Sequence, residues 1–248
     1  TMLHRSWRSC RSSHELLRGI GTSLSTLAPL IWGAQGGVGA TIIEILAAAA
    51  IAVVAVLMAP QPKDDPFYSY SGPPPLASIA PGTVLKTRSI PYHAVGVPTL
   101  LTTTQLLYRS TSQTGNPTVN VTSVIQPLIQ LDKTKVISYQ SAYDSLNQND
   151  EPSYAISGGL TLGGVVSGVE GAVFGPFIAD GYTVIVCDTE GQRVDFAAGP
   201  EYGMNTLDSI RAAFQSSTVG LPSDAKVAML GYSGGAIATE WAAELAPT

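Results

Sequence analysis

The most informative part of the sequence runs Lys226-Val-Ala-Met-Leu-Gly-Tyr-Ser-Gly-Gly-Ala-Ile-Ala-Thr-Glu-Trp-Ala-Ala-Glu-Leu245. It opens with an apolar run of strand length at residues 227–230, continues into a G-x-S-x-G pattern centred on Ser233, and ends in an Ala-, Glu- and Leu-rich run without a helix breaker. These features predict a strand, a tight turn and a helix, in that order. This order is the context of a nucleophile elbow, in which a strained turn presents a serine.

The glycines around Ser233 have a steric explanation in such a turn. Side chains at Gly231, Gly234 and Gly235 would collide with the strand or the helix that flank the serine. We therefore predict Ser233 as a catalytic nucleophile, with the Gly234 N–H directed at the oxyanion that forms during acyl transfer. Tyr232 completes the elbow and is expected only to pack. The alternative is a serine in an ordinary strand-to-helix turn.

Composition restricts the class of protein. The chain has 248 residues, of which 45% are hydrophobic and 12% charged, and a formal net charge of −5. An acidic balance of this kind gives no footprint for nucleic acid. Cys10 and Cys187 are too few for a disulfide scaffold, and they lack metal-ligand spacing, so we expect no metal site. Cys187 lies in an apolar strand pattern and is expected to be a small buried residue.

The first sixty residues differ from the rest. Residues 1–36 are basic and are expected to be disordered, whereas an apolar run begins at Val38 and ends at Ala59. Its length fits a membrane-spanning helix or, within residues 37–60, the core of a signal peptide. A buried soluble helix is the third alternative. The arginines precede the apolar run, which predicts export of the remaining chain, either secreted or anchored with its C-terminal part outside.

The remaining residues predict an α/β domain over 76–248, after a proline-rich linker at 61–75. Early strands are followed by alternating strands and helices, the pattern of a sheet with parallel crossovers. A turn at residues 115–117 predicts a hairpin. The nucleophile is then expected at the carboxyl end of a central strand, as in an α/β-hydrolase. Expected strands lie at 84–89, 100–110, 118–127, 136–140, 183–187 and 227–230, and expected helices at 169–179, 205–216 and after Ser233.

A further pattern concerns modification. Asn120-Val-Thr matches the acceptor for N-glycosylation, which applies only if the chain is exported. We therefore note Asn120 as a possible glycan site.

From about Asp65 to Pro247 the sequence resembles the fungal secretory lipases, the group that includes lipase A of Candida antarctica. The resemblance implies a secreted α/β-hydrolase that needs no cofactor, acts on triacylglycerols and other carboxylic esters, and works at a lipid–water interface. It also implies that Ser233 is the nucleophile and that Gly234 and Asp144 supply the oxyanion N–H groups. A turn aspartate is the alternative for Asp144. The matching pieces, in family order, are Asp65-Pro-Phe-Tyr, Gln105-Leu-Leu-Tyr-Arg, Ser138-Tyr-Gln-Ser-Ala-Tyr-Asp-Ser, Asp188-Thr-Glu-Gly, Thr206-Leu-Asp-Ser-Ile-Arg-Ala-Ala, Asp224-Ala-Lys-Val, Gly231-Tyr-Ser-Gly-Gly-Ala and Ala238-Thr-Glu-Trp-Ala-Ala-Glu-Leu.

The remaining catalytic groups are not found where this fold has them. An α/β-hydrolase carries its acid and its histidine after the nucleophile, yet no Asp or His follows Ser233 here. His4 and His14 lie in the basic segment, and His93 is expected to be a surface or core residue. The sequence is therefore interpreted as an α/β-hydrolase truncated after the elbow. Two functions stay open: a secreted lipase whose Asp and His are missing from this chain, or an inactive, membrane-tethered fragment or interaction protein.

Overall fold

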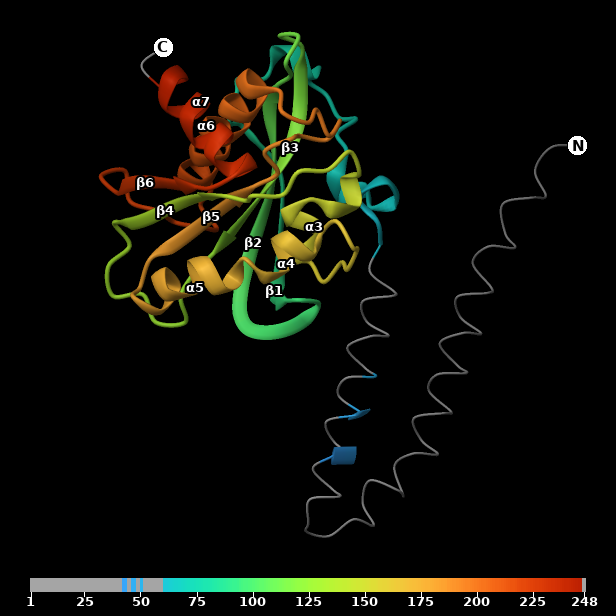
Figure 1. Cartoon of the computed structure of the whole chain (residues 1–248). Coiled ribbons are helices and arrows are strands. Elements are labelled where there is room, and N and C mark those ends of the chain that lie inside the picture. Colours follow the sequence, from blue (N-terminus) through green and yellow to red (C-terminus); the bar gives the residue numbers. More distant parts are fainter. Residues whose placement is uncertain (1–41, 44–45, 48–49, 51–59, 247–248) are drawn as a thin grey trace, which may run out of the picture. The chain divides into compact units, whose positions relative to one another are not determined.

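The computed structural model describes residues 60–246 and five isolated positions before them, 42, 43, 46, 47 and 50 (Figure 1). The chain divides into two units, Thr1–Ile51 and Ala52–Thr248. In the first unit the five described positions are helical. The basic segment and most of the predicted signal or anchor segment lie outside the described residues. Among the residues that are described, no helix is both long and apolar enough to span a bilayer.

The second unit is built on one sheet, whose described strands lie in the order β1-β2-β3-β5-β4-β6. Antiparallel pairing joins β1 to β2, β2 to β3, and β3 to β5, whereas β5, β4 and β6 are parallel. The sheet is therefore mixed, as the sequence predicts. The strands are β1 (Val84–Ala94), β2 (Val97–Thr111), β3 (Pro117–Ile125), β4 (Lys135–Gln140), β5 (Thr183–Cys187) and β6 (Lys226–Gly231).

Helices cover both faces of the parallel strands (Figure 1). On one face, Ile137 and Val184 pack with Phe174; on the other, Ile185 packs with Ala212. Because neighbouring residues of a strand point to opposite faces, β5 is buried along its whole length. The helices are α3 (Pro152–Ile156), α4 (Val165–Val169), α5 (Gly171–Ala179), α6 (Gly199–Gln215) and α7 (Gly234–Leu245), with short 3-10 turns η1 (Pro62–Asp64), η2 (Pro66–Tyr68), η3 (Leu76–Ser78) and η4 (Gln148–Asp150).

Three features differ from the sequence-based prediction. Strands β1 and β2 extend toward each other beyond the predicted ranges 84–89 and 100–110 and form a first hairpin, in which Val95 and Gly96 both adopt positive φ and make a two-residue turn. Helix α6 begins at Gly199, six residues before the predicted start at Asn205. The third difference concerns residues 61–75: Tyr68 is buried and packs with Leu107, so the first part of the expected linker belongs to the folded unit.

The expected position of the last strand also differs. Within the described residues β6 pairs with β4 and is the final strand in the order, not a central one. Its carboxyl end nevertheless lies beside that of β4, because the two strands are parallel and Gln140 pairs with Gly231. The segments that follow these two strands therefore emerge at the same edge of the sheet.

Candidate active site

Ser233 stands at the turn between β6 and α7, with backbone angles of φ 53° and ψ −126°. A serine rarely adopts positive φ, and such a conformation costs on the order of 1–3 kcal/mol. The residue is exposed, and its carbonyl accepts the N–H of Ala236 at 2.9 Å as α7 begins. The turn thus holds the serine hydroxyl at the surface, at the N-terminal end of a helix.

The glycines of the elbow are fixed by close approach. A Cβ atom on Gly231 would strike the backbone carbonyl group of Gly235, and a Cβ on Gly235 would strike that of Gln140. A Cβ on Gly234 would strike the Asp144 carboxylate. Strand, turn and helix are therefore packed too tightly for any side chain at these three positions, which confirms the steric argument made from the sequence.

Asp144 lies in the loop that follows β4, next to the elbow. One of its carboxylate oxygens is the nearest atom to the Cβ position of Gly234. Within residues 60–246, the backbone N–H groups of Asp144 and Gly234 donate no hydrogen bond. Partial desolvation raises the pKa of the Asp144 carboxyl above its usual range. Two free amides beside a helix N-terminus form a setting that favours negative charge.

Three carboxyl groups, those of Glu151, Asp188 and Glu190, are buried in the described part of the chain near the end of β5. Asp188 follows β5 and accepts hydrogen bonds from the N–H and hydroxyl of Ser153, at 2.8 and 2.6 Å. Burial raises the pKa of Asp188 to about 6 and that of Glu190 to about 7. Burial, together with the nearby Asp188 and Glu190 charges, raises the pKa of Glu151 well above its usual range.

Comparisons with known proteins identify relatives of the chain. Residues 157–248 match the family model described as secretory lipase. Lipase 4 of Candida albicans is 38% identical over 196 residues, which are 77% of this chain and 42% of that protein. The X-ray structure of Candida antarctica lipase A in its closed state is 37% identical, with a TM-score of 0.68 over 76% of this chain and 43% of that one. The chain is a relative of the fungal secretory lipases.

The likeness settles the fold, which is that of an α/β-hydrolase. Its extent is partial, since the chain spans about two fifths of the length of the curated relatives it matches. A protein of Mycobacterium tuberculosis named a probable inactive lipase is 39% identical over 186 residues. Likeness over this region is therefore shared by proteins named lipases and by one named a probable inactive lipase.

A catalytic base does not adjoin Ser233 in the described part of this secretory lipase relative. His93 lies in β1, and its Nδ1 is hydrogen-bonded to the Ile156 carbonyl at 2.9 Å, while its ring packs over Gly158. It is a half-buried structural residue, as the sequence predicts. His4 and His14 lie outside the described residues.

Asn120 is not available as a glycan site in the fold. Its side chain is fully buried in β3, and its amide nitrogen donates to the Tyr108 hydroxyl at 2.9 Å and to the Asp188 carbonyl at 2.7 Å. A glycan attached there would have to displace the core. The tripeptide pattern alone cannot reveal this, because it carries no information on burial. Cys187, in contrast, is buried and free, as predicted.

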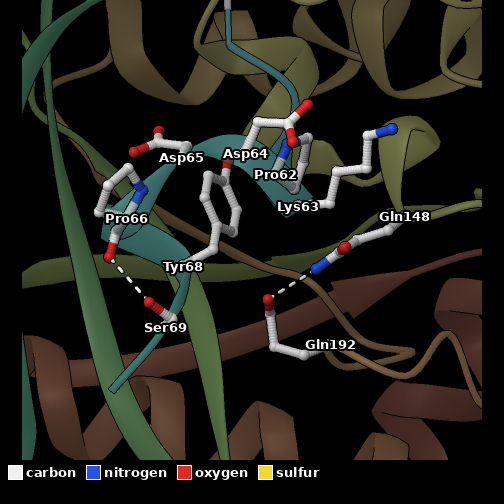
Figure 2. Close-up of a pocket in the computed structure, with 9 residues that line it drawn as sticks. All are labelled: Pro62, Lys63, Asp64, Asp65, Pro66, Tyr68, Ser69, Gln148 and Gln192. Atoms are coloured by element: carbon white, nitrogen blue, oxygen red, sulfur yellow. Dashed lines mark hydrogen bonds between the residues drawn. The ribbon is translucent and has the colours of Figure 1, made fainter. Parts of the chain in front are cut away.

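Three clefts in the described part of the chain do not include the elbow. One of about 460 Å³ lies beside η1 and η2, and Figure 2 shows Gln148 and Gln192 hydrogen-bonded to each other opposite those turns. Ser233 and Asp144 are not among the residues that line it. As for metals, no group of three His, Cys, Asp or Glu side chains within the described ranges is placed to hold an ion.

Sequence reasoning missed two buried carboxylates that contact the Asp144 loop, Glu170 and Glu190. Glu170 is the one charged residue between positions 157 and 179. A charged group that is buried in an apolar stretch needs a hydrogen-bonding partner. The isolated Glu170 could therefore have been recognised from the sequence as a residue that binds another part of the chain. Glu190 comes three residues after the end of β5, at the edge of the sheet where functional groups collect.

Proposed function

We propose that this protein hydrolyses carboxylic esters, triacylglycerols among them, with Ser233 as the nucleophile. The observation that carries the proposal is the positive φ of Ser233 at the helix start, beside two backbone N–H groups that donate no hydrogen bond in the described structure. The lipase names of its relatives support the substrate class.

In the proposed reaction, the Ser233 hydroxyl oxygen attacks the ester carbonyl carbon and its proton passes to a base. The Gly234 and Asp144 N–H groups stabilise the oxyanion of the tetrahedral intermediate. Collapse of this intermediate breaks the bond to the alcohol, and water then releases the acid from the serine. The two N–H groups act on the charge that develops in the transition state. Their loss is therefore expected to lower kcat more than it raises KM.

In an α/β-hydrolase the base and its acid partner follow the nucleophile in the sequence. No His or Asp follows Ser233 in the sequence. An oxyanion hole without a complete triad still accelerates hydrolysis by about a thousandfold over water. We expect the 248-residue chain to reach that level and not that of a complete lipase.

A simple experiment tests the role of Ser233. Hydrolysis of p-nitrophenyl butyrate by the purified 248-residue chain is compared with that by Ser233→Ala, with Ser217→Ala as the control because Ser217 is exposed and lies outside the elbow. We expect Ser233→Ala to lower the rate without removing the share that the oxyanion site contributes by itself, and Ser217→Ala to retain the full rate. Equal rates in all three proteins would overturn the proposal.

The second candidate is an inactive protein that binds a partner or a lipid surface. It is favoured by the engagement of His93 with Ile156 and by the relative named a probable inactive lipase. The intact mass of the natural protein, after deglycosylation, separates the candidates. Peptides beyond Thr248 that carry Asp and His would favour the enzyme, whereas a natural protein that ends at Thr248 would favour the inactive one.

We also propose that the protein is exported. The match to secretory lipases and the apolar run at residues 38–59 support this. Anchoring through that run is the alternative. Sequencing the N-terminus of the protein recovered outside the cell distinguishes a cleaved signal, which would remove the run, from an anchor, which would retain it.

A further inference from the structure

The loop that carries Asp144 is held on both sides by buried carboxylates from distant parts of the chain. The Ala142 N–H donates to Glu170 Oε1 at 2.7 Å, and the Ser145 N–H donates to Glu190 Oε1 at 3.3 Å. Both glutamates are buried, with 2% and 0% of their surface exposed. Asp144 lies between the two bonded amides, and its own N–H is left free.

We propose that Glu170 and Glu190 are positioning residues that fix the Asp144 N–H relative to Ser233. The inference rests on the proposed function, because it assigns a role to residues that support the oxyanion site. Neither glutamate touches the reacting atoms. Each acts through the backbone of the loop.

The physical reason for such support is the accuracy that an oxyanion site requires. A donor on a loop helps only if it is held within about half an ångström of its productive position. Hydrogen bonds from backbone N–H groups to carboxylates are stronger than those between neutral groups, so a short loop can be fixed by two of them. Bonds to both neighbours of Asp144 limit rotation of the peptide that carries its N–H.

Glu170 also connects the loop to the elbow. It lies between α4 and α5, and burial raises its pKa, while the neighbouring Ser141, Ala142, Tyr139 and Tyr232 groups oppose this rise. Tyr232 directly precedes Ser233. The Glu170 carboxylate therefore interacts with the loop at Ala142 and with Tyr232, the residue before the nucleophile.

Glu190 has a second connection to the same loop. Its backbone N–H donates to the hydroxyl of Tyr143 at 3.1 Å, and its carboxylate accepts the Tyr202 hydroxyl at 2.9 Å. Tyr143 is buried immediately before Asp144. The segment after β5 thus contacts the loop at Tyr143 and at Ser145, while Glu170 holds it at Ala142.

The experiment compares Glu170→Ala, Glu170→Gln, Glu190→Ala and Glu190→Gln with Asp208→Asn. Asp208 is a matched control, because it is a buried carboxylate on α6 that bonds Ser110 and Arg211 and does not contact the loop. Two quantities are measured for each protein: hydrogen exchange of the amides at 142–145, and the Ser233-dependent kcat and KM on p-nitrophenyl butyrate. Urea denaturation establishes that each variant is folded under the assay conditions.

We expect Glu170→Ala to speed exchange at Ala142 by about tenfold or more and to lower kcat by roughly 10- to 100-fold with little change in KM, because a donor displaced by about 1 Å can cost two orders of magnitude. Glu170→Gln keeps a carbonyl acceptor and should restore most of the rate. Glu190→Ala should act in the same direction at Ser145, and Glu190→Gln should restore most of that rate. Asp208→Asn should lower stability without changing exchange in the loop or kcat.

Each result has a defined meaning. Unchanged exchange at Ala142 and Ser145 in the alanine variants would overturn the proposal, whatever the hydrolysis rate. Faster exchange with an unchanged Ser233-dependent kcat would leave the bonds merely structural and would also overturn it. If Ser233→Ala retains the full rate, the proposed function fails instead, and the exchange data still decide whether the two glutamates fix the loop.

Discussion

The turn of the first hairpin and the elbow place a non-glycine residue at nearly the same unusual angle, φ 50° at Val95 and φ 53° at Ser233. Their surroundings differ. Val95 is followed by Gly96, and the turn closes an antiparallel pair in which Ala94 lies opposite Val97. Ser233 joins a parallel strand to a helix and is packed against the end of β4.

The comparison shows that strain has two uses here. In the hairpin it serves only connectivity, because a two-residue turn with positive φ matches the twist of the paired strands. In the elbow it directs a hydroxyl to the surface beside free N–H groups. Parallel strands end at one edge, so the segments after β4, β5 and β6 meet there, whereas the hairpin turn joins neighbours in sequence.

The largest expected effect tests how tightly the elbow is packed. Gly235→Ala places a Cβ against the Gln140 carbonyl and should destabilise the protein by about 3 kcal/mol or more, because backbone must move. Gly175→Ala is the control, since a Cβ there meets no atom within 4 Å and alanine favours a helix. Urea denaturation measures both. Equal stabilities for the two variants would show that the elbow is looser than described.

The next effect concerns the two buried carboxyl groups that follow β5, Asp188 and Glu190. The folded-state pKa values of Asp188 and Glu190, about 6 and about 7, exceed their ordinary values of 3.8 and 4.5. Between these limits the folded state binds more protons than the unfolded state, so stability is highest at low pH and falls as pH rises. One pKa unit corresponds to about 1.4 kcal/mol, so we expect a loss on the order of a few kcal/mol between about pH 4 and pH 8.

A substitution within this group sharpens the pH prediction. Glu151→Gln should raise the unfolding free energy at pH 8 by about 1–2 kcal/mol, because one ionisable group fewer is then buried beside Asp188 and Glu190. Glu244→Gln on the exposed surface of α7 is the matched control and should change little. An unfolding free energy that rises from pH 5 to pH 8 in the unmodified chain would contradict the raised pKa values of Asp188 and Glu190.

The third prediction separates the strain at Ser233 from its chemistry. Ser233→Gly should relieve the positive φ and stabilise the protein by about 0.5–1 kcal/mol, while Ser233→Ala should leave stability close to that of the original chain. Both should lower the rate of ester hydrolysis, leaving only the share that the oxyanion site contributes by itself. Thermal denaturation and the p-nitrophenyl butyrate assay measure the two effects separately. A less stable Ser233→Gly would mean that φ 53° is not a strained state here.

The smallest effect applies the same reasoning to the hairpin. Val95→Asn should stabilise by about 0.5–1 kcal/mol, because asparagine tolerates the left-handed region better than a β-branched residue does. Unlike the Ser233 variants, it should keep the hydrolysis rate. A rate change with Val95→Asn would show that the two turns are coupled, against the comparison drawn above.

The sequence by itself determined the elements whose signals are local. The strand, the G-x-S-x-G turn and the helix around Ser233 could be read because apolar runs, glycines and helix formers follow one another directly. The buried strand Thr183–Cys187 and the hairpin around Gly115 could be predicted for the same reason. The glycine sterics were also predictable, since a tight turn leaves no room for a Cβ wherever it occurs.

Only the tertiary structure decided the features that depend on distant residues. Helix α6 starts at Gly199 with Pro200 in its first turn, where proline is tolerated, and Gly199 and Gly203 both lie too close to Trp241 for a side chain, a contact that the local sequence does not reveal. The burial of Asn120 and Tyr68 depends on neighbours far along the chain. The contacts of Glu170 and Glu190 with the Asp144 loop join residues 28 and 45 positions apart, and such a pairing leaves no local pattern, because folding alone brings these groups together.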